Sequence, residues 1–91
     1  MISLETACEQ MYETYRRCGY PGIGGIGDVG GEWVFVQAPE KENGDLPLGD
    51  HPIFIDKETG KTRRMVFDVP DLQLLNSARK VRVPGRFRPV Y

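Results

Sequence analysis

The chain has 91 residues, of which 40% are hydrophobic and 27% are charged, and its net charge is −1. This length accommodates one domain, and the ordinary composition excludes a collagen, a long coiled coil and a wholly disordered chain. No apolar run approaches the ~18 residues of a transmembrane helix. Because the first residues lack a basic stretch followed by an apolar one, we expect no signal peptide and no membrane association.

Charge is unevenly distributed along the chain. Residues 1–60 hold eleven acidic and four basic side chains, a net charge of −7, whereas residues 61–91 hold eight basic and two acidic ones, a net charge of +6. Such an asymmetry marks a surface that meets a charged partner. Alternatively, the two parts neutralise each other within one small fold, and the sequence leaves both interpretations open.

The first predicted element is an amphipathic helix over residues 3–18. Ser3 is a favourable N-cap, and Gly19 closes the helix. The apolar stripe consists of Leu4, Ala7, Cys8, Met11, Tyr15 and Cys18, and the acidic ridge of Glu5, Glu9 and Glu13. This spacing indicates one face that packs against the rest of the protein.

The two cysteines, Cys8 and Cys18, both belong to this helix. Ten helical residues span about 15 Å, whereas a disulfide needs Cα atoms within about 7 Å. We therefore predict two reduced thiols, as expected in a cytoplasmic protein. Cys8 is interpreted as a small core residue rather than a nucleophile.

The middle of the chain predicts strands. Residues 20–31 are rich in glycine and suit a bulged edge strand or a hairpin arm. Residues 32–37 are aromatic and β-branched on both faces, as in a well-buried strand. Residues 38–51 form a polar loop, which is long for a compact domain, and long loops are often functional or mobile.

The second half of the chain predicts a hairpin and a helix. Residues 52–55 form a third strand, and Gly60 closes a turn into a fourth strand over residues 62–67. Asp68 caps a short helix that ends near Ala78. The remaining residues add a short edge strand and then a tail.

These elements predict an α+β fold. We expect a small antiparallel sheet of three to five strands, with the N-terminal helix and the short C-terminal helix packed on one face. Residues 1–91 form a single domain, in which residues 79–91 are a basic C-terminal extension.

Catalytic and ligand motifs are weak. The letters G-x-G-x-x-G at residues 22–27 follow a helix and precede a strand, the reverse of a dinucleotide-binding unit. His51 is the only histidine, so no catalytic triad can be assembled. Because no His/Cys spacing suits a metal, we expect no metal, no cofactor and no enzymatic activity.

The basic segment 79–88 carries five basic residues, with Phe87 and Tyr91 nearby. Basic side chains interleaved with aromatic ones can hold single-stranded nucleic acid. The sequence pI of about 5.8 argues against a dedicated nucleic-acid-binding protein. A solvated or partner-ordered tail is the alternative interpretation.

Two stretches together resemble a known family. They are Gly31-Glu-Trp33-Val-Phe35-Val-Gln37 and Gly49-Asp-His-Pro52-Ile-Phe-Ile55-Asp56-Lys57-Glu-Thr-Gly60-Lys. With the helices on either side, they resemble the YrhB-like proteins, also called the immunity protein 35 family, over about residues 3–78. The matching residues Trp33, Phe35, Pro52 and Gly60 are interpreted as structural.

The resemblance implies an immunity protein, or antitoxin, of a bacterial polymorphic toxin system. Such a protein binds a cognate toxin domain in the cytoplasm and blocks its active site without catalysis. We expect the acidic side chains of the polar loop, Glu40, Glu42, Asp45 and Asp50, to form part of the surface that binds the toxin, helped by the acidic ridge; the alternative is a loop that is only solvated. Two other functions stay open, a chaperone-like interaction module and a nucleic-acid-binding accessory protein that uses the basic tail.

Overall fold

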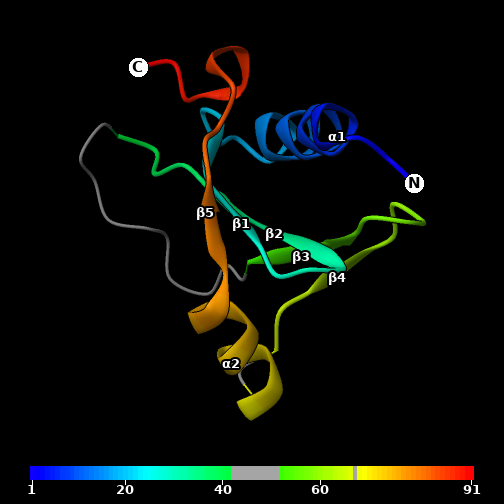
Figure 1. The fold of residues 1–91 in the computed structure, drawn as a ribbon. Coiled ribbons are helices and arrows are strands. Elements are labelled where there is room, and N and C mark those ends of the chain that lie inside the picture. The colour runs from blue at the N-terminus through cyan, green and yellow to red at the C-terminus, as the bar shows by residue number, and fades with distance from the viewer. Residues whose placement is uncertain (42–51, 67) are drawn as a thin grey trace.

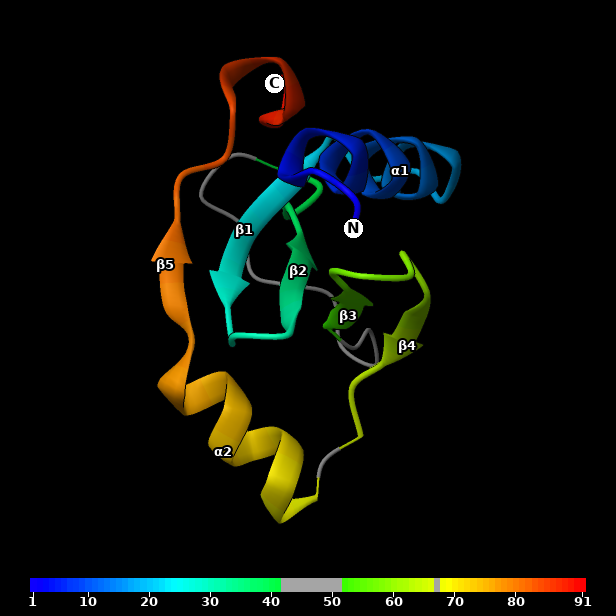
Figure 2. The same ribbon diagram turned by 45° about the vertical axis from the view of Figure 1, so that its right-hand side comes forward.

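The computed structural model describes residues 1–41, 52–66 and 68–91. Its elements are α1 (Leu4–Arg17), β1 (Ile23–Asp28), β2 (Glu32–Gln37), β3 (Ile53–Asp56), β4 (Thr62–Arg64), α2 (Val69–Ser77), β5 (Arg79–Val81) and the 3-10 turn η1 (Gly85–Phe87). The strands form an antiparallel sheet in the order β4-β3-β2-β1-β5 (Figures 1 and 2). The predicted α+β class is therefore confirmed. Within the described ranges, no helix has the length and apolar character needed to span a bilayer.

Helix α1 begins and ends as its sequence predicts. The Ser3 hydroxyl accepts a hydrogen bond from the Thr6 amide at 3.1 Å, which satisfies one free N–H of the first turn. Gly19 follows the last turn with a φ of 93°. The helix buries Ala7, Cys8, Met11 and Tyr15. As predicted, both cysteines are free thiols, and Cys8 lies in the core.

The two helices cover opposite faces of the sheet. Trp33 and Phe35 of β2 pack in the cluster that contains α1, whereas Val34 packs with Phe54, Met65 and side chains of α2. Neighbouring residues of a strand point to opposite faces, so these two clusters lie on different sides. The expectation that both helices pack on one face is corrected accordingly, because the apolar pattern of a short helix does not specify the face it covers.

Strand β1 lies inside the sheet, between β2 and β5. Its predicted bulge is present between Ile23 and Gly25, and it forms an arm of the β1–β2 hairpin, as one of the two predicted alternatives has it. The other alternative, an edge strand, is wrong, because β5 pairs with its outer side. A Cβ at Gly27 would lie 2.9 Å from the Ala78 Cβ. Glycine at this position thus allows the end of α2 to approach the sheet closely.

The turn between β3 and β4 uses local hydrogen bonds. The Asp56 carboxylate accepts bonds from the amides of Glu58 and Thr59 at 2.8 and 3.1 Å. Gly60 adopts a φ of 75°, as a left-handed turn residue does. Strand β4 is shorter than predicted, and Phe67 lies outside the described residues.

The C-terminal residues belong to the fold. Strand β5 confirms the predicted edge strand, but the residues after it do not form a free tail. Phe87 is only 4% exposed and packs in the cluster under α1, with its ring centroid 5.8 Å from that of Tyr12. Figure 2 accordingly places the C-terminal turn beside α1.

Candidate functional site

The predicted acidic surface begins directly after β2. Glu40 is exposed, three residues beyond the end of the strand. The other three predicted residues, Glu42, Asp45 and Asp50, lie outside the described residues, as does His51. The structure therefore gives a position for Glu40 alone among the four predicted partner-binding residues.

The segment between β2 and β3, which carries the four predicted acidic residues, is held by hydrogen bonds at Pro39 and at Pro52. The Tyr91 hydroxyl donates a hydrogen bond to the Pro39 carbonyl at 2.8 Å, so the C-terminus holds one end. At the other end, the Met65 amide donates to the Pro52 carbonyl at 2.8 Å, which ties the entry of β3 to β4. Glu40 thus projects from a braced point of the fold.

The acidic ridge of α1 is neutralised within the molecule. Arg86 donates hydrogen bonds from one guanidinium nitrogen to the carboxylates of Glu5 and Glu9. Arg17 pairs with Glu13 one helical turn away. The ridge is therefore not a free acidic surface for a partner. For these residues the structure favours internal neutralisation of the charge asymmetry.

A second ion-pair network joins the sheet to α2. Arg63 donates to Glu32 at 3.0 and 3.1 Å and to both oxygens of Asp71 at 3.0 and 3.1 Å. The Val66 amide also donates to Asp71, and this bond, followed by the Arg63 pair, lowers the pKa of the Asp71 carboxyl. The hydrogen bond from Arg63 to Glu32 raises the guanidinium pKa. This network is structural, since all three charges are satisfied by one another.

Lys57, in the turn after β3, connects β1 and β2. Its ammonium lies 2.8 Å from an Asp28 carboxylate oxygen and 5.1 Å from the centroid of the Trp33 ring. Hydrogen bonds from Lys57 and from the Gly30 amide lower the pKa of Asp28. Trp33 and Phe35 are buried, which confirms their structural interpretation.

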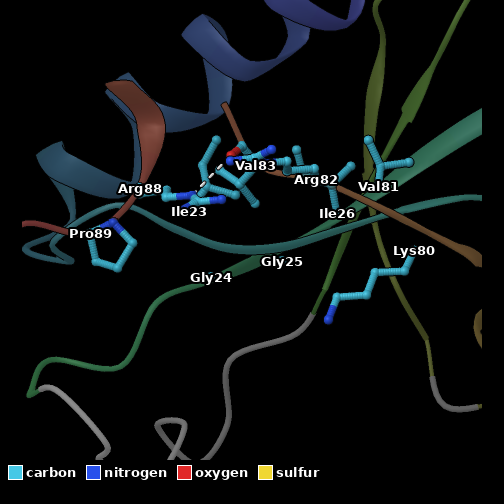
Figure 3. Close-up of a pocket in the computed structure, with 10 residues that line it drawn as sticks. All are labelled: Ile23, Gly24, Gly25, Ile26, Lys80, Val81, Arg82, Val83, Arg88 and Pro89. Atoms are coloured by element: carbon cyan, nitrogen blue, oxygen red, sulfur yellow. Dashed lines mark hydrogen bonds between the residues drawn. The ribbon is translucent and has the colours of Figure 1, made fainter. Parts of the chain in front are cut away.

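Three further basic side chains line a groove. The groove has a volume of about 600 Å³ and lies between the first half of β1 and the segment from β5 to Pro89 (Figure 3). Its basic lining residues are Lys80, Arg82 and Arg88, which are exposed and form no ion pair with a carboxylate of the described residues. The sequence identified these residues as basic but did not indicate the groove, because its other wall is formed by glycines of β1.

One of the two aromatic rings near the basic segment is not available for stacking on bases. Phe87 is buried beneath α1. Tyr91 is about half exposed, and its hydroxyl is bonded to Pro39. Since single-stranded nucleic acid is held partly by stacking on exposed rings, the burial of Phe87 weakens the predicted alternative of nucleic-acid binding, which stays a prediction.

A reactive site built on the Cys8 thiol or on a metal ion would need an ionised thiol or a cluster of metal ligands. Burial raises the pKa of the Cys8 thiol to about 11, so the thiol stays protonated at neutral pH. Among residues 1–41, 52–66 and 68–91, no three His, Cys, Asp or Glu side chains gather to hold a metal ion. The groove and the exposed acid at Glu40 are therefore the features that we consider for function.

Comparison of the chain with protein-family models, with curated proteins and with solved structures found no match.

Proposed function

We propose that the chain is an immunity protein, a non-enzymatic antitoxin that binds a cognate toxin domain in the bacterial cytoplasm. The proposal starts from the family resemblance of the β2 and β3 segments. The structural observation that carries it is the braced exit of the acid-rich connection after Pro39. Residues 38–51 contain four acidic residues and one basic residue, so the sheet holds a net acidic segment between two anchored ends.

The proposed inhibition is steric and electrostatic. Toxin domains that act on nucleic acids or nucleotides often have a basic active-site cleft that holds phosphate groups. An acidic segment occupies such a cleft directly and accelerates the encounter through charge steering. In this proposal Glu40, Glu42, Asp45 and Asp50 contact the basic cleft, whereas α1, whose acids are paired with Arg86 and Arg17, supports the fold.

The proposal is tested by purifying the tagged chain from the organism that produces it and analysing the intact complexes by native mass spectrometry. We expect a one-to-one complex with a protein whose isolated form has a toxic activity that the complex lacks. Retention of that activity in the complex contradicts the proposal. Copurification with nucleic acid instead of a protein contradicts it as well.

A further inference from the structure

The groove beside β5 is an interruption of the sheet. The pairing between β1 and β5 extends from Asp28 to Ile26, which lies opposite Val81, and it ends there. Beyond this point the two segments separate and then approach each other again, since a Cβ at Gly22 would lie 2.9 Å from the backbone of Pro89. An elongated opening thus lies between two backbone segments that are in contact at both of its ends.

Main-chain groups form one wall of this opening. Gly24 and Gly25 continue β1 beyond its last pair with β5, so no β5 residue lies opposite them. Neither residue has a side chain, and a Cβ at Gly24 would lie 2.7 Å from the Gln37 carbonyl oxygen on the β2 side. Close packing on β2 explains the glycine, and it also leaves the groove side accessible to another main chain.

The rest of the lining combines apolar and basic side chains. Ile23 and Ile26 are buried core residues that form the floor of the groove, and Val81, Val83 and Pro89 are half-buried. Lys80 lies at one end of the groove and Arg88 at the other, where its Nε donates to the Val83 carbonyl at 3.1 Å (Figure 3). Exposed basic side chains spaced along such a groove fit a ligand that is long and negatively charged.

We infer that this groove binds an acidic, extended segment of a partner protein, alongside β1 and β5. This inference rests on the proposed function, in which the partner is a protein. The acidic segment is the part of that partner that the groove recognises. An extended chain pairs its main chain with strand backbone, while its carboxylates meet Lys80, Arg82 and Arg88.

Charge disfavours a second copy of the chain that pairs through its own β5. Antiparallel pairing of β5 with another β5 would bring Arg79 and Lys80 next to the same basic residues of the copy, and like charges on facing strands are destabilising. An acidic segment gains attraction from the same side chains. The burial of Phe87, which removes a stacking surface, favours a peptide over a nucleic acid.

The inference is tested by fluorescence anisotropy of the full chain with a short labelled peptide of alternating glutamate and valine. We expect saturable binding, which is weakened about tenfold or more by the double variant Lys80→Glu/Arg82→Glu. The control variant Arg16→Glu/Lys61→Glu makes the same change in net charge away from the groove and is expected to alter the affinity by less than about twofold. Circular dichroism checks that both variants fold, and Lys80→Ala/Arg82→Ala replaces the first variant if it does not.

Equal weakening by both double variants overturns the inference, because the attraction would then come from net charge alone. Tighter binding of labelled oligothymidylate than of the acidic peptide overturns it too, and assigns the groove to nucleic acid. These outcomes are distinguishable from failure of the proposed function. If the Lys80→Glu/Arg82→Glu variant binds the toxin with the same affinity as the parent protein, the groove is not part of the interface, and the antitoxin proposal still stands.

Discussion

At the scale of single residues, the β3–β4 turn depends on one backbone conformation. Gly60 has a φ of 75°, and an added Cβ would also contact Ile2 at 3.4 Å. We expect Gly60→Ala to lower the free energy of unfolding by about 1–2 kcal/mol, measured by urea denaturation. The control is Gly31→Ala, whose Cβ meets nothing within 4 Å, with an expected change below about 0.5 kcal/mol. Equal losses in both variants would show that the turn conformation is not the cause.

Asp28 makes stability depend on pH in a predictable direction. Lys57 and the Gly30 amide lower its pKa in the folded protein. The stabilisation is therefore present above the ordinary pKa of 3.8 and is lost as the pH falls through the lowered folded value. We expect Asp28→Asn to lower the free energy of unfolding at neutral pH. The difference in this free energy between the variant and the parent protein is expected to become smaller as the pH falls. Urea unfolding across this range is the measurement, and a difference that does not change with pH contradicts the assignment.

Local interactions were predictable from the sequence, and distant ones were not. The caps at Ser3 and Asp68 and the turn at Gly60 depend on residues within a few positions, so sequence spacing reveals them. Arg63 instead pairs with Glu32, which is 31 positions away. No local pattern specifies such a partner, because the pairing exists only once the sheet has formed.

At the scale of elements, the C-terminal turn η1 completes the core under α1. We expect Phe87→Ala to lower the free energy of unfolding by about 3 kcal/mol, because it removes a buried ring that contacts Tyr12. Val90→Ala is the control, since Val90 is 73% exposed and a change below about 0.5 kcal/mol is expected. Urea denaturation of both variants makes the comparison. A Phe87→Ala protein as stable as the parent would mean that this segment is a tail after all.

The strands were predictable as elements, but their neighbours were not. Residues 32–37 form the buried strand that their alternating side chains predict. The position of β1 depends on β5, which follows it by about fifty residues and reaches it only after α2. The side of the sheet that α2 covers depends on that same path. Neither arrangement is encoded in the period of a short apolar pattern.

At the scale of the whole molecule, the fold neutralises only part of the charge asymmetry. Arg86 and Arg63 pair with acids from the first half of the chain. Lys80, Arg82 and Arg88 have no such partner among the described residues. The interpretation of internal neutralisation therefore holds for Arg86 and Arg63, whereas a surface that meets a charged partner stays a prediction. The groove itself was not predictable because it requires β1 and β5 to separate after pairing.

The proposed inhibitory surface predicts a change in association kinetics. We expect the triple variant Glu40→Lys/Glu42→Lys/Asp45→Lys to bind the copurified toxin about tenfold or more slowly at low salt, because it removes charge steering. Stopped-flow mixing gives the association rate. The control compares the single variants Glu40→Lys and Glu58→Lys, because Glu58 is exposed, lies outside this surface and forms no ion pair with the described residues. An unchanged rate for the triple variant, or equal slowing in the two single variants, contradicts the assignment of this surface.

Survival of cells that express the copurified partner is the most direct measurement of the central claim. The account predicts that the partner alone stops growth and that coexpression of this chain restores it, in proportion to the amount of complex formed. Growth arrest that persists despite a stoichiometric complex would contradict the claim that the chain neutralises its partner by binding.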